Sequence, residues 1–304
     1  MIGFKRLDLA EKAKYDRYFM NCGERGCEYS FVNLFLWGRQ KAAFVGDFLV
    51  LQSQFDRRCV YPFPVGRGDV GPVLDAIIHD ARARGISCCL TSLTAAECEL
   101  LENRYPGRFR FHAARDNYDY VYDIDGLADL KGRKYQKKRN HLNRFRDSHP
   151  DCVLLPLADW DMEAIGALLR QWYESRKAAN PDTDYHLEEL ALERAIRFRD
   201  RLGLEGLALM ENGRLLAFTL GSRLNCDTFD IHFEKAIEET AYAAINQAFA
   251  RYLREKYPEL RFLNREDDMG LEGLRKAKLS YSPDKMIEKY WARLWEEEDE
   301  HHPA

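Results

Sequence analysis

The order of the elements predicted after residue 150 is the feature that most limits what this chain can fold into. Two amphipathic helices precede two strands joined at the turn Asn212-Gly213, and strand, helix, strand and helix follow. Strands that pair through a tight turn and then alternate with helices imply a mixed sheet with helices on both faces. The predicted segments are strand Cys152–Leu157, helices Met162–Arg176 and Leu187–Leu202, strands Leu207–Met210, Leu215–Arg223 and Thr228–Glu234, helix Tyr242–Tyr257, strand Leu260–Glu266, a helix within Gly270–Leu279 and a last element at Met286–Trp295.

A similar but less complete order occupies the first part of the chain. Its predicted segments are a hairpin at Ala43–Gln52 about Gly46-Asp47, strand Cys59–Phe63, helix Val70–Arg84, strand Ile86–Leu93, helix Ala95–Tyr105 and a long strand or hairpin at Arg108–Ile124. The length of 304 residues is enough for two domains. We therefore predict an α/β fold with two tandem domains at 1–130 and 151–295, a basic helix between them at 131–150 and a solvated acidic tail at 296–304.

The segment Lys131–Arg146 concentrates positive charge, with eight Lys or Arg and no acid. A helix here would place Tyr135, Leu142 and Phe145 on one buried stripe. Two interpretations are open: a solvated helix face, or a platform for phosphates whose binding would be salt-sensitive. The candidate nucleic-acid or phosphate ligands are the basic side chains mostly outside the stripe: Lys134, Lys137, Lys138, Arg139 and Arg144.

Composition argues against several classes of protein. The 46% apolar and 32% charged residues are typical of a globular chain in water. The apolar run Phe31–Trp37 is far shorter than the ~18 residues of a membrane span, so we predict no integral membrane segment and a cytoplasmic protein, possible peripheral membrane binding aside. Eight cysteines without a CxxC pair or zinc-like spacing predict reduced thiols and no metal site. A net charge of −4 means that any nucleic acid would need a local basic patch.

Polar and apolar residues alternate in the predicted strand Phe229–Glu234. Successive side chains of a strand point to opposite faces, so Asp230, His232 and Glu234 would share one face. Either this is an edge strand with its polar face in water, or it is a central strand whose three titratable side chains line a water-filled cleft.

The next predicted strand carries its own polar residues to its carboxyl end. Asn264 and Glu266 would share one face there, and Arg265 would take the other. Ligands of open α/β sheets usually bind beyond the carboxyl ends of strands. We therefore hypothesise that Glu234 and Glu266 open into one shared crevice.

A run of opposite charges follows that strand. Asp267 and Asp268 could cap a helix that begins near Gly270, because aspartate accepts hydrogen bonds from exposed N–H groups at a helix start. The helix would present three cations: Arg275, Lys276 and Lys278. These charges form either a structural ion-pair network or a site in which the cations hold a phosphate-bearing donor.

Several motifs resemble those of a known bacterial family. They are EYSFVNLFLW at Glu28–Trp37, KGRKYQKKRNHLNRF at Lys131–Phe145, HFEKA at His232–Ala236 and AYAAIN at Ala241–Asn246. The family is similar to the C-terminal catalytic domain of phosphatidylglycerol lysyltransferases and, more distantly, to the Fem-type peptidoglycan aminoacyltransferases. The resemblance covers roughly residues 28 to 283. It implies two tandem domains of the GCN5-related N-acetyltransferase type and, in the better-known relatives, transfer of an aminoacyl group from a charged tRNA.

Acyl transfer requires a base for the nucleophile, donors for the oxyanion and an acid for the leaving group. Glu234 and Glu266 are the candidate bases, and His232 is a third, although a lone histidine is often structural. The resemblance implies that Tyr281 protonates the leaving group. The candidate substrate-binding residues are Tyr242, Asn246, Asn264, Arg265, Asp267, Asp268, Arg275, Lys276 and Lys278.

The sequence thus predicts an acyl or aminoacyl transferase that uses aminoacyl-tRNA and a small-molecule, peptide or lipid acceptor with an amine or hydroxyl group. An N-acyltransferase dependent on acyl-coenzyme A is the alternative. Acetyltransferases bind the pyrophosphate of that cofactor at a position where this chain has Lys235–Thr240, which lacks glycines and carries acids. A non-catalytic RNA-binding or ligand-binding protein on the same scaffold is a third possibility.

Overall fold

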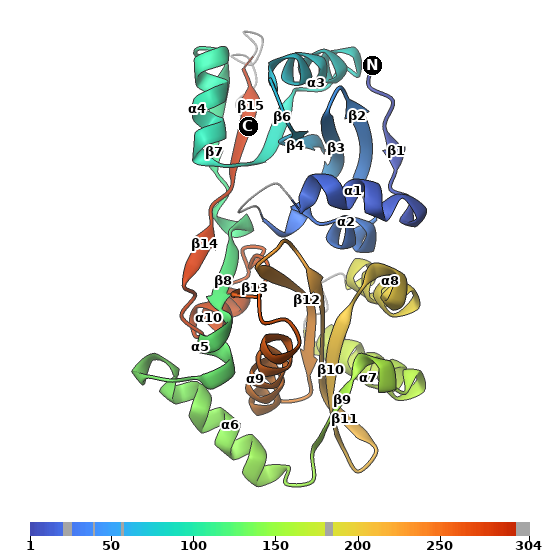
Figure 1. The fold of residues 1–304 in the computed structure, drawn as a ribbon, viewed down its shortest axis with the longest axis vertical. Coiled ribbons are helices and arrows are strands. Elements are labelled where there is room, and N and C mark those ends of the chain that lie inside the picture. Colours follow the sequence, from blue (N-terminus) through green and yellow to red (C-terminus); the bar gives the residue numbers. More distant parts are fainter. Residues whose placement is uncertain (21–25, 39, 56–57, 180–184, 296–304) are drawn as a thin grey trace. The chain divides into compact units, whose positions relative to one another are not determined.

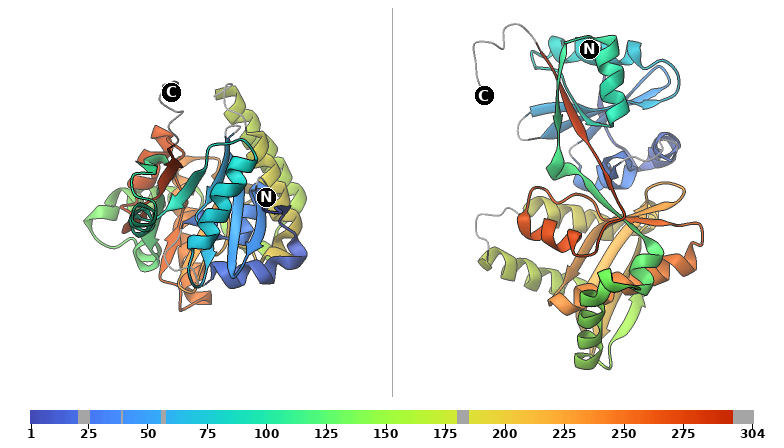
Figure 2. Two further views of the ribbon diagram at one scale, coloured as in Figure 1. Left: turned by 90° about the horizontal axis from the view of Figure 1, so that it is seen from above. Right: turned by 90° about the vertical axis from the view of Figure 1, so that its left-hand side faces the viewer.

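Two α/β units make up the protein. The computed structural model describes residues 1–20, 26–38, 40–55, 58–179 and 185–295. The first unit comprises Met1–Asp119, Asp267–Leu271 and the chain from Ile287 onward; the second comprises Tyr120–Glu266 and Glu272–Met286. Each unit contains one mixed β-sheet with helices packed against it (Figures 1 and 2), which confirms the predicted α/β class with two tandem domains.

The first unit has an eight-stranded sheet in the order β1-β2-β3-β4-β6-β15-β7, with β5 beside β3. Its strands are β1 Lys5–Arg6, β2 Gln40–Val45, β3 Phe48–Phe55, β4 Arg58–Pro62, β5 Val65–Gly66, β6 Cys89–Leu93, β7 Phe109–Ala113 and β15 Tyr290–Leu294. Its helices are α1 Lys12–Phe19, α2 Phe31–Trp37, α3 Gly71–Ala83 and α4 Ala95–Arg104. The predicted hairpin about Gly46-Asp47 is confirmed, because β2 and β3 pair from Val45 and Phe48 outward.

A buried lysine holds three separate segments of the first unit together. Nζ of Lys289 lies 2.6 Å from Asp119 and 2.6 Å from Glu28, and the backbone N–H of Cys27 donates to Asp119 over 2.7 Å. The Lys289 side chain is only 5% exposed, yet these carboxylates overcome the cost of burial and raise the pKa of its ammonium. The charge is therefore retained inside the unit, where it fixes the chain just before β15.

The second unit has a seven-stranded sheet in the order β14-β8-β13-β12-β11-β10-β9. Its strands are β8 Asp119–Asp123, β9 Val153–Pro156, β10 Glu205–Glu211, β11 Arg214–Arg223, β12 Thr228–Ala236, β13 Phe262–Asn264 and β14 Lys285–Ile287. Its helices are α5 Ile124–Asp129, α6 Gln136–Ser148, α7 Met162–Ala179, α8 His186–Leu202, α9 Glu239–Lys256 and α10 Glu272–Leu279.

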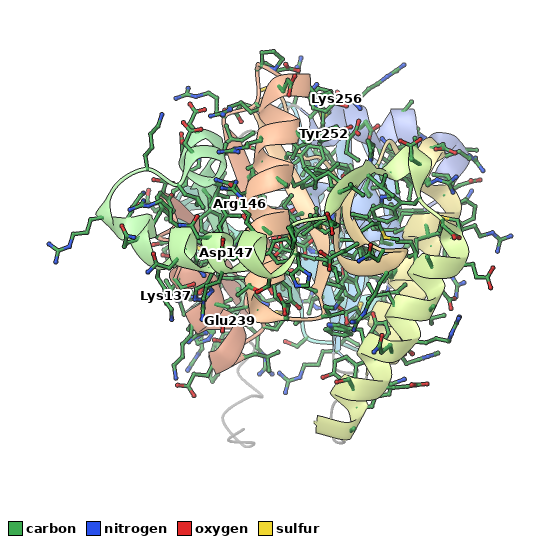
Figure 3. All side chains as sticks on the ribbon, turned by 90° about the horizontal axis from the view of Figure 1, so that it is seen from below. Lys137, Arg146, Asp147, Glu239, Tyr252 and Lys256 are labelled. Atoms are coloured by element: carbon green, nitrogen blue, oxygen red, sulfur yellow. The ribbon has the colours of Figure 1, made fainter. Side chains whose placement is uncertain are left out.

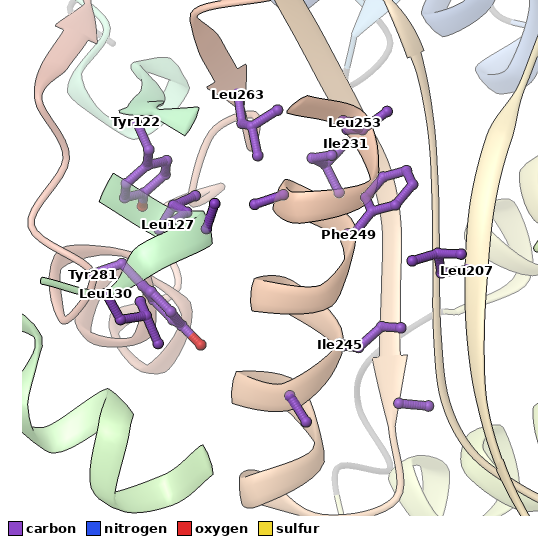
Figure 4. Packing of buried hydrophobic residues seen from close by; sticks show 14 of the residues in the cluster. Tyr122, Leu127, Leu130, Leu207, Ile231, Ile245, Phe249, Leu253, Leu263 and Tyr281 are labelled. Atoms are coloured by element: carbon purple, nitrogen blue, oxygen red, sulfur yellow. The ribbon is translucent and has the colours of Figure 1, made fainter. Parts of the chain in front are cut away.

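Helices cover both faces of this second sheet. On the first face, here called the α9 face, Phe229 of β12 packs edge-on against Phe249 of α9, and Ile231 and Leu263 join the same core (Figure 4). On the second face, the α7/α8 face, Nζ of Lys235 lies over the ring of Trp172 in α7 and pairs with Glu188 of α8 over 2.6 Å. Burial of apolar side chains between the sheet and α9 is the main stabilising contribution.

One extra residue in β12 changes which side chains share a face. Leu220 of β11 pairs with Phe233, but the next residue, Gly221, pairs with Ile231, so His232 is inserted opposite β11. Such a β-bulge reverses the alternation beyond it. Only glycine fits at position 221, because a Cβ there would lie 2.2 Å from the backbone oxygen of Asp230.

Two strands join sheets that the sequence pattern did not indicate. The predicted long strand Arg108–Ile124 is divided by a 3-10 helix at Arg115–Asn117, with β7 in the first sheet and β8 in the second. β15 joins the first sheet between β6 and β7, where Ala292 and Leu294 enter the core. The predicted domain boundaries at 130 and 151 are therefore wrong, since the second unit begins at Tyr120 and includes α6. The predicted tail at 296–304 lies outside the described residues.

The bulge gives a test of the fold. Gly221→Ala should lower the free energy of unfolding by about 1–3 kcal/mol, because its methyl group collides with backbone. Gly273→Ala is the matched control, since a Cβ at this helical glycine meets nothing within 4 Å. Urea unfolding measures both variants, and equal stability would contradict the bulge.

Candidate functional site

The edge of β12 that faces β13 is only partly paired. β12 pairs with β13 through Asp230, opposite Asn264, whereas it pairs with β11 as far as Ala236. Residues 231–236, here called the open edge of β12, therefore extend beyond the end of β13 in the described part of the unit. Diverging strands leave backbone groups that a ligand can approach, and this position at strand ends is where open α/β sheets bind ligands.

A buried ion pair lies on the α9 face of the open edge. Nη2 of Arg265 donates to Oε1 of Glu234 over 2.8 Å, and Asn246 of α9 donates to Oε2 over 3.1 Å. The two charged side chains are 13% and 12% exposed. Burial opposes the charge of Arg265, but Glu234 prevails and raises the pKa of the guanidinium. Both carboxylate oxygens of Glu234 are thus engaged, which makes this residue an anchor for Arg265 rather than a free base.

Tyr281 connects this ion pair to the basic helix α6. The Arg265 guanidinium lies 4.8 Å from the Tyr281 ring centroid, and Nζ of Lys138 lies 3.7 Å from the same centroid. Burial, followed by the charge of Arg265, lowers the pKa of Lys138 to about 8. Burial raises the pKa of Tyr281, so its hydroxyl remains protonated at neutral pH. The cluster offers a proton donor and cations at one place.

A second cluster lies on the opposite, α7/α8 face. Nδ1 of His232 is 3.2 Å from Oε1 of Glu266 and 3.6 Å from Oδ2 of Asp230, and Nε2 is 2.8 Å from Oγ of Ser222. Asp230 is completely buried, and the His232 side chain is 2% exposed. The Glu266 side chain is 19% exposed and is the part of this cluster that reaches the surface.

The chain after β13 is held in a strained conformation that positions Glu266. Glu266 has a φ of 56°, in the left-handed region that residues other than glycine rarely adopt. Asn264 accepts a hydrogen bond from the Glu266 backbone N–H over 2.7 Å. Nζ of Lys278 donates to the backbone oxygens of Arg265 and Glu266. Lys278 is therefore a structural residue of this turn.

The hypothesis of one shared crevice is wrong. The predicted alternation continues just past the end of β13, where Arg265 points to the α9 face and Glu266 to the other. In β12 the bulge at His232 moves Glu234 to the α9 face, while His232 stays with Asp230 on the α7/α8 face. The two predicted bases therefore lie on opposite sides of the sheet, flanking the open edge from both faces.

Helix α6 presents a basic outer face. Lys137 and Arg144 are exposed and line a shallow groove with Asn140, His141, Asn143 and Asp147. Figure 3 shows Lys137 and Asp147 along α6, whereas Arg146 reaches toward α9 and donates to Gln247 over 3.4 Å.

The buried stripe predicted for α6 is confirmed, but the predicted set of outward-facing cations is not. Tyr135, Leu142 and Phe145 are buried, and so is Lys138. Arg139 donates to the backbone oxygens of Leu130 and Gly132, so it closes the turn before the helix. Lys134 is exposed and pairs with Asp284 over 3.3 Å. Lys137 and Arg144 therefore remain the best candidates for phosphate contacts.

Two histidines attach α6 to the start of α9. His149 contacts Glu211 over 2.7 Å and Glu238 over 3.3 Å, and these carboxylates raise its pKa. His141 lies 3.7 Å from Glu239, but burial lowers its pKa. The N-terminus of α9 is thus already supplied with carboxylates, which disfavours a phosphate at this position.

The other predicted substrate-binding residues are dispersed. Asp267 and Asp268 belong to the first unit, where they accept from the N–H groups of Met269 and Gly270 in a loop that precedes α10. Asp268 also pairs with Arg115. The predicted helix cap is therefore wrong, since α10 begins at Glu272. Three further candidates lie in the second unit: half-buried Arg275, Lys276 in an exposed pair with Glu272, and half-buried Tyr242 against the α9 core.

Two clusters in the described residues have the spacing of metal ligands. One is Cys27, Glu28 and Asp119, where the Lys289 ammonium already supplies the positive charge. The other is Asp230, His232 and Glu266. Both ring nitrogens of His232 already have partners there, Ser222 at Nε2 and Glu266 at Nδ1.

Comparison with known proteins connects this geometry to a family. The model of the family described as phosphatidylglycerol lysyltransferase, C-terminal, matches residues 19–293. The chain belongs to this family. The match covers both units, confirms the resemblance predicted from the motifs and supports a transferase of acyl groups in the broad sense.

Solved structures of this lysyltransferase family and its relatives share the fold. A conserved protein of unknown function from Bacteroides thetaiotaomicron is 38% identical, with a TM-score of 0.89 over 97% of this chain and 100% of that chain. A C-terminal domain from Agrobacterium fabrum, assigned to the lysylphosphatidylglycerol synthetases, is 14% identical with a TM-score of 0.67 over 96% and 94%. L-PGS from Bacillus licheniformis is 17% identical with a TM-score of 0.66 over 95% and 93%.

An uncharacterized protein of Mycoplasmoides gallisepticum is 27% identical over 209 residues, 67% of this chain. The match spans 64% of that relative's length. Within the described ranges, every helix of this family member is too short or too polar to traverse a lipid bilayer.

The role of Glu234 can be tested by stability. Glu234→Gln should lower the free energy of unfolding by about 3 kcal/mol, because it leaves the Arg265 charge buried without its partner. The matched control is Glu272→Gln, whose pair with Lys276 is mostly exposed and should change stability by less than about 1 kcal/mol. Urea unfolding of both variants is the measurement. If the loss of unfolding free energy is no larger than in the control, Glu234 is available as a base.

The histidine anchors of α6 predict opposite pH dependences. The pKa of His149 is raised on folding, so its stabilisation is present below the unfolded value of about 6.5 and is lost as pH rises through the folded pKa. The destabilisation caused by His149→Asn should therefore shrink from pH 6 to pH 9. Burial lowers the pKa of His141, so the destabilisation caused by His141→Asn should grow as pH rises from that lowered pKa to the unfolded value of about 6.5. Parallel curves for the two variants in urea unfolding would contradict this assignment.

Proposed function

We propose that this protein transfers an aminoacyl group from aminoacyl-tRNA to an acceptor with an amine or hydroxyl group. One observation carries the proposal. The open edge of β12 lies between a cationic cluster that continues into α6 and, on the other face of the sheet, a histidine–carboxylate cluster. Membership of the lysyltransferase family supports the same class of reaction.

The α9 face has the chemistry of a donor site. Lys137 and Arg144 on α6 would contact tRNA phosphates, which each release counterions when neutralised. Arg265 and Lys138 would place positive charge near the ester, where negative charge develops in the transition state. Tyr281 keeps its proton and would supply it to the leaving hydroxyl of the tRNA.

The α7/α8 face has the chemistry for activating a nucleophile. His232 contacts Glu266, which orients the imidazole, and the imidazole can accept a proton from an attacking group. The reacting carbonyl would lie at the open edge, with the donor approaching from the α9 face. An acceptor would approach from the α7/α8 face. Small molecules, peptides and lipids that carry an amine or hydroxyl group all satisfy this requirement.

The carboxylates near the start of α9 favour tRNA over acyl-coenzyme A. A pyrophosphate bound where β12 leads into α9 would meet Glu238 and Glu239, and both pair with histidines of the α6 segment. Coenzyme A would therefore be repelled at this helix N-terminus. In the groove of α6, Lys137 and Arg144 face a single acid of the lining, Asp147.

Charge reversal on α6 tests the donor. Lys137→Glu with Arg144→Glu should weaken tRNA binding and reduce the slope of log affinity against log salt by about two, because two phosphate contacts are lost. Arg197→Glu with Arg201→Glu on α8 is the control, with the same change of charge at two exposed positions. Filter binding between 50 and 200 mM salt, about the range over which phosphate contacts dominate, is the measurement.

Equal weakening by both double variants would show non-specific attraction and contradict a platform on α6. If the protein binds acyl-coenzyme A and has no affinity for tRNA, acyl-coenzyme A is the donor and the proposal of aminoacyl-tRNA is wrong. Normal tRNA binding without transfer of a radiolabelled aminoacyl group to any acceptor would indicate a binding protein on the transferase scaffold.

A further inference from the structure

Ser222, near the end of β11, completes an ordered chain of groups on the α7/α8 face. Its Oγ is 2.8 Å from Nε2 of His232, and Nδ1 of the same ring is 3.2 Å from Glu266 and 3.6 Å from Asp230. With the ring proton on Nδ1, that N–H donates to a carboxylate, and Nε2 accepts from the serine hydroxyl. Hydroxyl, imidazole and carboxylate in this order activate a serine for attack on a carbonyl.

We propose that Ser222 is a nucleophile that carries the acyl group between donor and acceptor. The inference deepens the proposed function and rests on it for the identity of the donor. Its basis is geometric, because the nitrogen of His232 that can accept a proton already faces Ser222. An external nucleophile could use this nitrogen only after displacing the serine.

The pairing of β11 with β12 creates this arrangement. Ser222 pairs with Asp230 across the two strands, so both side chains occupy the α7/α8 face. His232, two residues further along β12, lies on the same face by ordinary alternation. Gly221 beside Ser222 permits the close approach of the strands. Strand pairing and alternation therefore assemble the base, its carboxylate and the hydroxyl, and the bulge directs Glu234 away from them.

Burial of the cluster suits a covalent intermediate. Ser222 is 2% exposed, whereas the Glu266 side chain is 19% exposed, so the acyl group of a donor on the α9 face would pass around the open edge of β12 and reach the serine past Glu266. Water has little access to the serine ester that would form, which limits hydrolysis before the acceptor arrives. The left-handed turn at Glu266 places this entry beside the reacting groups.

The step balances without a further reactant. Oγ of Ser222 bonds to the carbonyl carbon of the donor ester as its proton passes to Nε2 of His232. The bond between that carbon and the ester oxygen of the tRNA then breaks, Tyr281 gives its proton to the departing oxygen, and the proton on His232 returns to Tyr281 through water. In the second step the acceptor attacks the serine ester, its proton passes to His232, and the Ser222 hydroxyl is restored.

Acylation by p-nitrophenyl acetate tests the serine without tRNA or an acceptor. Intact-protein mass spectrometry and peptide mapping should find one acetyl group on Ser222 in the wild-type protein. Ser222→Ala should lack this label, and His232→Gln should acquire it about a hundredfold more slowly, as expected for loss of a general base. Ser280→Ala is the matched control, because this exposed serine of the same unit only donates to a backbone oxygen.

Ser222→Cys separates chemistry from folding. If the alanine variant unfolds, the cysteine variant keeps a nucleophile of similar size and should acquire the acetyl group as a thioester. Acetylation of another residue at the wild-type rate, or equal labelling of wild type and Ser222→Ala, would overturn the proposal. Labelling of Ser222 in a protein that fails to bind tRNA would retain the nucleophile and refute only the donor, so the two failures are distinguishable.

Discussion

The insertion of His232 into β12 determines which side chains can meet in the second unit. Before the bulge, Phe229 and Ile231 pack on α9; beyond it, Glu234 takes that face and is fixed by α9 and Arg265. A regular strand would instead place Glu234 on the α7/α8 face with Asp230 and His232, away from Arg265 and Asn246. The bulge therefore separates two acidic centres and gives each its own partner.

Buried lysines fix the segments that regular secondary structure leaves free. Lys278 binds the backbone oxygens after β13 and so maintains the turn of Glu266, while Lys289 binds carboxylates in the first unit just before β15. A buried ammonium is costly unless a carboxylate neutralises it or it donates several hydrogen bonds. Each lysine meets that condition at a point where the chain leaves one sheet, and each makes a loop conformation specific.

Local patterns predicted much of the fold, because hydrophobic periodicity and turn residues act over a few positions. The helix at Val70–Arg84 and the hairpin about Gly46-Asp47 agree with α3 and with β2 and β3. The membership of β8 and β15 could not be predicted, since an alternating strand does not specify its neighbours. Nor could the bulge, which depends on Gly221 in the adjacent strand. Ser222 was missed because its pairing with Asp230 is not visible in the sequence. Lys138 was predicted as a phosphate ligand, but its burial against Tyr281 was not, because the two residues are distant in sequence.

Placement of the two clusters on opposite faces suits the proposed acyl transfer better than one shared crevice would. A donor with phosphates needs cations, whereas deprotonation of a nucleophile needs carboxylates and a neutral imidazole; in one pocket each set would shift the pKa values of the other unfavourably. Here β12 separates Arg265 and Lys138 from His232 and Glu266, and its open edge is the place where both sets approach. The carbonyl carbon of an ester at that edge could be polarised from one face and attacked from the other. Because attack on a carbonyl occurs perpendicular to its plane, an edge between two faces satisfies the geometry that acyl transfer requires.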